Sequence, residues 1–149
     1  MTIKYFYIFI AILGGALLPI QAGLNAELAR RVDSPILGAL ASFIVGGLAL
    51  LTAAIIMRVN WPEWQTLKSY PLGLWIGGLF GAFIVFVTIV AAPRLGATAL
   101  LGFILAGQMI AALVFDHHGF LGFPVQQVNI GRTFGVILVI LGAIMIRRF

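Results

Sequence analysis

The stretch LLPIQAGLNAELARR, residues 17–31, is where the chain departs most clearly from a uniformly apolar membrane protein. The preceding residues 5–18 are almost continuously apolar, and Gln21, Asn25 and Glu27 then bring polar groups into the same span. An apolar run of this length predicts a helix that crosses a membrane. We therefore expect one membrane helix with its polar groups toward one end.

Helical spacing decides which of these polar groups lie together. Residues three and four apart share a face of a helix, so Gly14, Leu18, Gln21 and Asn25 form one stripe. Glu27 lies about 200° around the helix axis from Asn25, at roughly 100° per residue. The two amides are thus predicted on one face and the carboxylate on another.

The composition places the whole chain among integral membrane proteins. Its 149 residues are 62% hydrophobic and 9% charged, with a mean hydropathy of +1.16. That is more apolar surface than a soluble domain of this size can bury. The nine basic residues behind the net charge of +5 are scattered at the ends of apolar runs, which is typical of interfacial anchors rather than of a nucleic-acid surface.

The sequence lacks the patterns typical of enzymes. It has no nucleotide-binding loop, no Ser–His–Asp arrangement and no carboxylate pair in mid-membrane, and without cysteine it has no thiolate chemistry or cysteine metal ligands. His117 and His118 adjoin Asp116, but adjacent residues point apart on a helix and no further ligand cluster accompanies them. We predict no catalytic residue, no metal and no cofactor.

The apolar runs predict an all-α integral membrane protein, with a single transmembrane domain over residues 1–149. The five predicted spans are residues 5–28, 36–57, 72–92, 97–115 and 130–146. Short loops at 33–35 and 93–96 make consecutive helices pack as hairpins. The fifth span has fourteen residues between Arg132 and Arg147, about 21 Å, so its arginines must snorkel or the membrane must thin locally.

Five crossings place the two termini on opposite sides of the membrane. The amino-terminal side then carries Lys4, Arg58, Lys68 and Arg132, and the other side carries Arg30, Arg31, Arg94, Arg147 and Arg148. Because this balance leaves little of the bias that orients membrane proteins, we expect insertion in both directions and an antiparallel homodimer, which supplies the inverted symmetry common in transporters. The alternative is that one extra arginine, or a charge near the first helix, suffices to orient the chain.

Small residues mark where helices can approach one another closely in lipid. Gly38, Ser42 and Gly46 share one face of the second span, and Gly77 and Gly81 share one face of the third. These faces are compatible with packing grooves and with the lining of a solute path.

Polar side chains inside the spans are costly in lipid and need partners. Gln108 lies near the middle of the fourth span, and Gln21 and Asn25 lie in the first. Interhelical hydrogen bonding and a substrate site would both meet this need, and the sequence leaves the two alternatives open. For the second alternative, the predicted cavity residues are Gln21, Asn25, Ser42, Trp75, Gly77, Thr88 and Gln108.

Charged residues near the span ends predict ion pairs. Glu27 precedes Arg30 by three residues and Arg31 by four, which is the helical spacing for a local pair at the interface. Asp116 is expected in an interfacial turn near Arg132. Glu27, Asp116 and Arg132 are also the candidates for coupling or gate residues.

Four short motifs stand out along the chain. They are IQAGLNAELAR (20–30), the SF and VGG of residues 42–47, AGQM (106–109) and FDHHGFLGFP (115–124). Together with Arg132 and a glycine-bearing last helix, they resemble the YdcZ-like family, whose members are five-helix proteins of the drug/metabolite transporter superfamily. The resemblance covers essentially the whole length. It implies a ten-helix antiparallel pair, formed by a dual-topology dimer, by two oppositely oriented proteins or by one fused chain.

A looser similarity concerns Trp75-Ile76-Gly77, which is similar to the Trp-x-Gly of the third helix in small multidrug resistance exporters. Those exporters use a carboxylate in the middle of the first helix as a shared proton and cation site. Here the same region offers Gln21 and Asn25, and Glu27 is displaced toward the interface. The similarity therefore does not extend to proton-coupled export of lipophilic cations by that mechanism.

From the residues and the resemblance together, we expect a transporter subunit of the bacterial inner (plasma) membrane that moves a small organic solute by alternating access. Its expected partners are a second copy of itself or a closely related, oppositely oriented protein, the membrane lipid and the solute, and nucleic acid is not among them. A cavity without fixed net charge favours a neutral or weakly polar solute. The competing class is a non-transporting membrane subunit that stabilises or regulates a partner complex.

Overall fold

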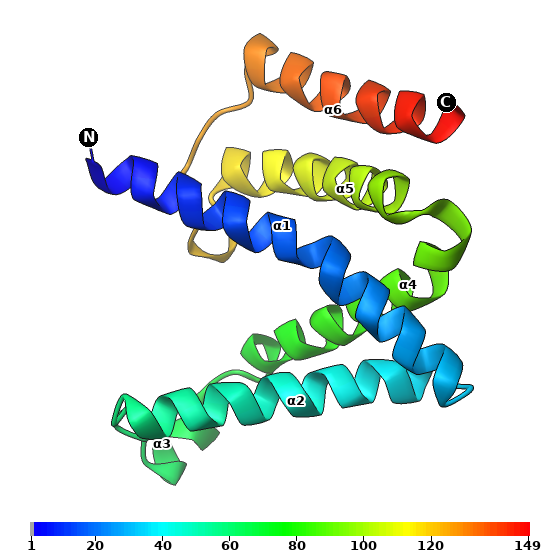
Figure 1. Ribbon diagram of the computed structural model, residues 1–149. Helices are drawn as coiled ribbons and strands as arrows, with labels where there is room; N and C mark the ends of the chain where they lie inside the picture. Colours follow the sequence, from blue (N-terminus) through cyan, green and yellow to red (C-terminus); the bar gives the residue numbers. More distant parts are fainter. Residues whose placement is uncertain (1) are drawn as a thin grey trace. The chain divides into compact units, whose positions relative to one another are not determined.

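The computed structural model describes residues 2–149, and every regular element in that range is a helix (Figure 1). The elements in chain order are α1 (Thr2–Arg31), α2 (Pro35–Ile56), α3 (Trp64–Ser69), η1 (Leu72–Ile76), α4 (Gly77–Leu95), α5 (Ala97–His118), η2 (Phe120–Gly122) and α6 (Ile130–Arg148). Within the described range five helical segments, with η1 and α4 counted as one, are long and apolar enough to cross a membrane. The prediction of five spans is confirmed.

One predicted loop is wrong, because α4 continues through Pro93 and ends at Leu95. Proline lacks the N–H that would bond the carbonyl four residues back, but membrane helices tolerate this loss. The helix ends only at Gly96, which has φ of +76° and whose N–H still bonds the Ala92 carbonyl at 3.0 Å. The short helix α3, within the connection between the second and third spans, was not predicted.

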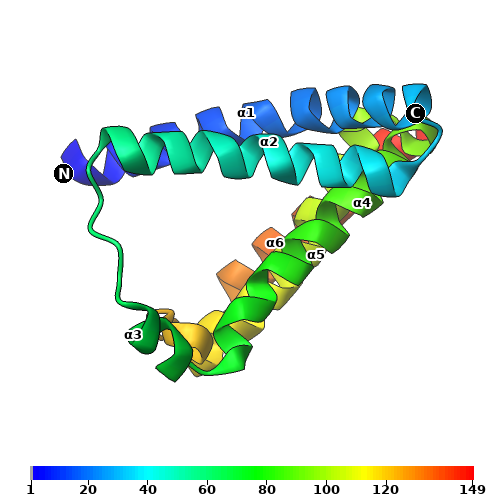
Figure 2. The ribbon, with the colours of Figure 1, turned by 90° about the horizontal axis from the view of Figure 1, so that it is seen from below.

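The chain divides into two compact units, Met1–Val90 and Ala91–Phe149. In the amino-terminal unit, α1 and α2 form an antiparallel hairpin, seen edge-on in Figure 2. Its turn contains Asp33 in a left-handed conformation, with φ of +51°. Ser34 then caps α2, because its side-chain oxygen accepts the Leu37 N–H at 3.3 Å, and Pro35 occupies the first helical position, where no N–H is needed.

The core of this unit is made of small side chains. Ala29 of α1, Ala39 of α2 and Ile89 of α4 form a buried cluster, and Ala22 and Ala26 are buried along α1. Helices α1 and α2 approach each other closely at Gly38, where an added Cβ would lie 2.8 Å from the Cβ of Ala29. A glycine is therefore required at position 38 for the hairpin to pack at this distance.

In the carboxy-terminal unit, α5 and α6 pack side by side in opposite directions (Figure 1). They approach each other closely at Gly102, where a Cβ would lie 3.1 Å from the Cβ of Ala143. At the other end of the hairpin, Gly119 ends α5 with φ of +66°, and a side chain there would also meet Val125 at 2.7 Å. The chain then runs to Asn129, whose side chain caps α6 by accepting the Arg132 N–H at 2.9 Å.

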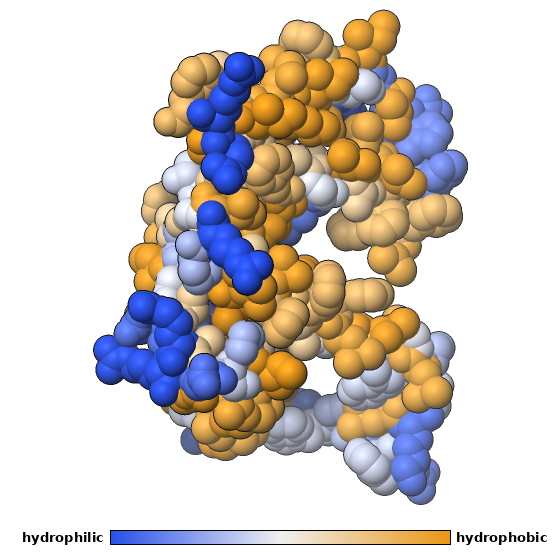
Figure 3. Space-filling model, turned by 90° about the vertical axis from the view of Figure 1, so that its right-hand side faces the viewer, coloured by the Kyte–Doolittle hydropathy of each residue, from blue (hydrophilic) through white to orange (hydrophobic). Residues whose placement is uncertain are grey.

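Most of the large apolar side chains of the described chain are exposed. Phe9 is 64% exposed and Leu50 74%. The face drawn in Figure 3 shows hydrophobic residues over most of the helices, with hydrophilic residues gathered in a few clusters. In water such a surface would aggregate, whereas lipid tails or another copy of the chain would cover it.

Candidate functional site

The first polar contact lies between α1 and α2. The Asn25 side-chain amide donates a hydrogen bond to the Ser42 hydroxyl oxygen at 3.1 Å, and Asn25 is only 8% exposed. In an antiparallel hairpin, residues equally far from the turn face each other, so Asn25 faces Ser42 just as Ala29 faces Gly38. The two contacts are four residues, or about one turn, apart on each helix. The close packing of Ala29 against Gly38 therefore holds the helices at the distance that the hydrogen bond between Asn25 and Ser42 needs.

The other predicted cavity residues of this unit are placed differently. The Gln21 side chain, one turn before Asn25 on α1, is exposed. Trp75 in η1 is 56% exposed, and a Cβ at Gly77, the first residue of α4, would meet nothing within 4 Å. The Thr88 hydroxyl donates to the Val85 carbonyl of its own helix at 2.7 Å. The structure thus joins Asn25 with Ser42, and within residues 2–90 it shows no side-chain hydrogen bond that joins any of the other four to one another.

Gln108 belongs to the carboxy-terminal unit, where its side chain on α5 is exposed. The expectation that Gln108 shares one pocket with Gln21 and Asn25 remains a prediction.

An aromatic groove lies between α2 and α4, and the sequence did not predict it. It has a volume of about 380 Å³, and Phe43, Phe83 and Phe86 are among its lining residues. The Phe43 ring reaches α4 at Gly81, where an added Cβ would lie 3.4 Å from it. Gly81 could have indicated this groove in the sequence, because a position without a side chain on one helix leaves room for a large side chain on the neighbouring helix.

Glu27 forms the ion pairs that its spacing predicts. Its carboxylate pairs with Arg30 and accepts a hydrogen bond from the Arg31 Nε at 2.8 Å. The two arginine side chains are 72% and 75% exposed, and exposed pairs of this kind contribute about 0 to 1 kcal/mol. The prediction of a local pair at the helix end is confirmed.

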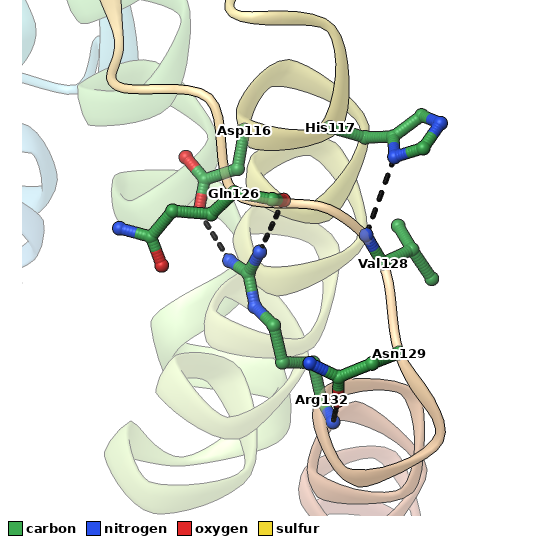
Figure 4. A network of polar contacts seen from close by, with 6 residues as sticks. All are labelled: Asp116, His117, Gln126, Val128, Asn129 and Arg132. Carbon is green, nitrogen blue, oxygen red and sulfur yellow. Dashed lines mark hydrogen bonds and ion pairs between the residues drawn. The ribbon is translucent and has the colours of Figure 1, made fainter.

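The second polar site joins the ends of α5 and α6 (Figure 4). The Arg132 guanidinium pairs with the Asp116 carboxylate and also donates to the Gln126 carbonyl at 2.6 Å. The Gln126 N–H in turn donates to the Asp116 carbonyl at 2.8 Å. A single guanidinium therefore holds the end of α5, the connecting loop and the start of α6 together, and the predicted proximity of Asp116 to Arg132 is confirmed.

His117 has a structural part in the same network. Its Nδ1 accepts the Val128 N–H at 3.2 Å, which holds the loop that precedes α6 (Figure 4). Among residues 2–149 no group of three or more histidine or acidic side chains could hold a metal ion. The roles of His117 and Gln126 were not predicted, because they depend on the path of an irregular loop.

A groove runs along the α5–α6 hairpin from this ion pair. Its volume is about 350 Å³, and Asp116 and Arg132 line one end. The remaining walls are Met109, Ala112 and Leu113 from α5 and Gly135, Val136 and Val139 from α6. The two side chains of the pair are 23% and 28% exposed, so the pair is partly accessible from solvent. The groove thus combines one opposed pair of charges with an apolar floor.

These features define the class of the protein: an integral membrane protein of five spans, with polar contacts between spans and an amphiphilic groove. A comparison with protein families identifies the particular family. The model of the family described as "Putative inner membrane exporter, YdcZ" matches residues 6–145. This match covers nearly the whole chain, and the protein belongs to that family.

The family match confirms the resemblance seen in the sequence motifs and the inner-membrane location. The family is described as an exporter, which is a class of transporter and not of enzyme. Searches of curated proteins and of solved structures gave no significant match.

Proposed function

We propose that this protein exports a small organic solute by alternating access, as an antiparallel pair of copies. The observation that carries the proposal is that Gln21 and Gln108, both within membrane-spanning helices, are exposed. Neither residue is buried by its own unit of the chain, and within residues 2–149 the structure shows no hydrogen bond from either side chain. An amide that faces lipid is costly, so each must be covered by other protein or by water.

A water-accessible path between helices meets this demand and gives the two amides a use. Amide groups can donate and accept hydrogen bonds, so they recognise an uncharged polar group on a passing solute. Asn25 lies one helical turn from Gln21 on the same face of α1, and with its partner Ser42 it would extend the polar lining. The aromatic groove between α2 and α4 would provide an apolar wall.

The antiparallel pairing is supported by the charges at the span ends. The nine basic residues divide four against five between the two sides, so the rule that positive residues stay inside favours neither orientation strongly. With an odd number of spans, two opposed copies give an inverted repeat, the arrangement in which many transporters place a substrate near mid-membrane. The family description as an exporter supports the outward direction.

The test compares the medium of cells that express the protein with that of cells that carry an empty vector, by untargeted mass spectrometry. We expect at least one small solute to accumulate outside only when the protein is present, and we expect Gln21→Leu and Gln108→Leu to abolish the accumulation. Gln65→Leu is the matched control, because Gln65 is exposed on α3, outside the candidate spans. Identical media, together with a membrane protein that co-purifies in fixed proportion, would instead support a regulatory subunit.

A further inference from the structure

We propose that the groove between α5 and α6 binds a small zwitterionic amphiphile, with an ammonium group at Asp116, a carboxylate at Arg132 and a short apolar tail along the groove. As a statement about the exported cargo, this rests on the proposed function. As a statement about binding, it rests on the groove alone.

The lining of the groove matches an amphiphilic ligand, with charged groups at one end and apolar residues along the rest. On α5 it extends from Met109 to Asp116 and on α6 from Arg132 to Val139, and the seven steps between the first and last residue on each helix span about 10 Å at 1.5 Å per residue. Both charged groups lie at the end near the connecting loop, and the rest of the lining is apolar. A ligand that fills it must therefore carry its polar groups at one end only.

The two charges select the kind of head group. Asp116 and Arg132 are about three-quarters buried and pair with each other. A ligand with one charge would take one partner and leave the other charge partly buried and unpaired, which is unfavourable. A zwitterion replaces the single pair by two pairs and leaves no charge without a partner. Arg132 also keeps its bond to the Gln126 carbonyl, so it remains in position while the exchange takes place.

The length of the groove selects a short tail. An alkyl chain advances about 1.25 Å per carbon, since C–C bonds are about 1.5 Å long, so 10 Å accommodates roughly eight carbons. A phospholipid tail must reach the middle of a hydrocarbon core about 30 Å thick, which is about 15 Å from the interface. The groove is too short to enclose such a tail, which favours a solute over a membrane lipid.

The test uses three probes with the same eight-carbon chain: 2-aminooctanoate, octanoate and octylamine. The full chain is placed in nanodiscs of phosphatidylglycerol, and binding is measured by titration calorimetry at neutral pH, with empty nanodiscs as the blank. We expect 2-aminooctanoate to bind at least tenfold more tightly than either singly charged probe. In Asp116→Asn the preference should change to octanoate, and in Arg132→Gln it should change to octylamine.

Two glycines of α6 provide a second test that leaves the ion pair intact. A Cβ at Gly135 or at Gly142 would meet nothing within 4 Å, but only Gly135 lines the groove. Gly135→Leu should therefore reduce 2-aminooctanoate binding at least tenfold, and Gly142→Leu should leave it unchanged. If Asp116→Asn and Arg132→Gln do not fold, the comparison of Gly135→Leu with Gly142→Leu tests the proposed site in their place.

Three results would overturn the proposal: equal binding of the three probes, an order of preference that the charge variants do not change, or full binding in Gly135→Leu. If phosphatidylethanolamine added to the nanodiscs displaces 2-aminooctanoate, and shows the same dependence on Asp116 and Arg132, the groove is a lipid site and the solute assignment is wrong. The outcomes for binding and export are separable. Export without probe binding refutes only this site, and probe binding without export refutes only the exporter function.

Discussion

Gly38→Ala tests the packing of the α1–α2 hairpin, on which the Asn25–Ser42 contact depends. The added Cβ would lie 2.8 Å from the Cβ of Ala29 and 3.1 Å from its Cα, whereas carbon atoms in contact lie about 3.5–4.0 Å apart. Since the crowded atoms include backbone, the two helices must separate by about 1 Å. One turn along, this separation would stretch the 3.1 Å bond beyond about 3.5 Å, where it no longer counts as a hydrogen bond.

Three contributions set the change in the free energy of unfolding. Overpacking costs about 1–3 kcal/mol, and the loss of an interhelical hydrogen bond in a membrane costs about 0.6 kcal/mol. Replacing a helical glycine by alanine stabilises the helix by about 1 kcal/mol, which offsets part of these costs. The packing cost outweighs the helix preference, so we expect a net destabilisation of about 0.5–2.5 kcal/mol.

The assay is equilibrium unfolding by SDS in mixed micelles, followed by far-ultraviolet circular dichroism. Gly46→Ala is the matched control, because Gly46 lies on the same face of α2 and a Cβ there meets nothing within 4 Å. The control should be neutral or more stable by up to about 1 kcal/mol. If Gly38→Ala unfolds at the same SDS fraction as Gly46→Ala, or at a higher one, the close packing inferred for this hairpin is wrong.

Three further predictions concern the charged and amide residues. Glu27→Gln should change the free energy of unfolding by less than about 1 kcal/mol, because its arginine partners are largely exposed. Export should persist at every pH, and loss of export with normal expression would make Glu27 a coupling residue. Asp116→Asn should destabilise the α5–α6 hairpin by about 1–3 kcal/mol, because it leaves the partly buried Arg132 without its counter-ion; unchanged hydrogen exchange at the Gln126 amide would contradict this. Gln21→Cys and Gln108→Cys should react with water-soluble thiol reagents in membranes. Leu50→Cys, in an apolar region of α2, is the control, and a reactivity no higher than that of this control would mean that the amides do not face water.

The sequence was sufficient to predict the five spans, because each apolar run is long and ends at polar or charged residues. It also predicted the pairs of Glu27 and of Asp116, since the first depends only on helical spacing and the second on a hairpin between adjacent spans. The Asn25–Ser42 contact could have been found in the same way, because both residues lie equally far from the midpoint of the turn, which falls between Asp33 and Ser34.

Other features depended on information that local patterns do not contain. The end of α4 was misplaced because proline usually ends a helix in soluble proteins, whereas Gly96, with its positive φ, is the residue that ends it here. The loop before α6 is held by bonds from Arg132 and His117 to backbone groups, and these follow from the path of the loop and not from residue type. The groove requires two helices at a particular register, which spacing within one helix does not determine.

The most direct test of the antiparallel exporter is the orientation of the termini in cells that express this chain alone. Alkaline phosphatase, which is active only outside the cytoplasm, and green fluorescent protein, which is fluorescent only inside it, would each be fused to the carboxyl terminus. The four-to-five balance of basic residues predicts that both fusions are active, and that two lysines added beside Lys4 leave only one of them active. If only one fusion is active in the unmodified chain, the copies share a single orientation, and the antiparallel pair of identical copies is contradicted.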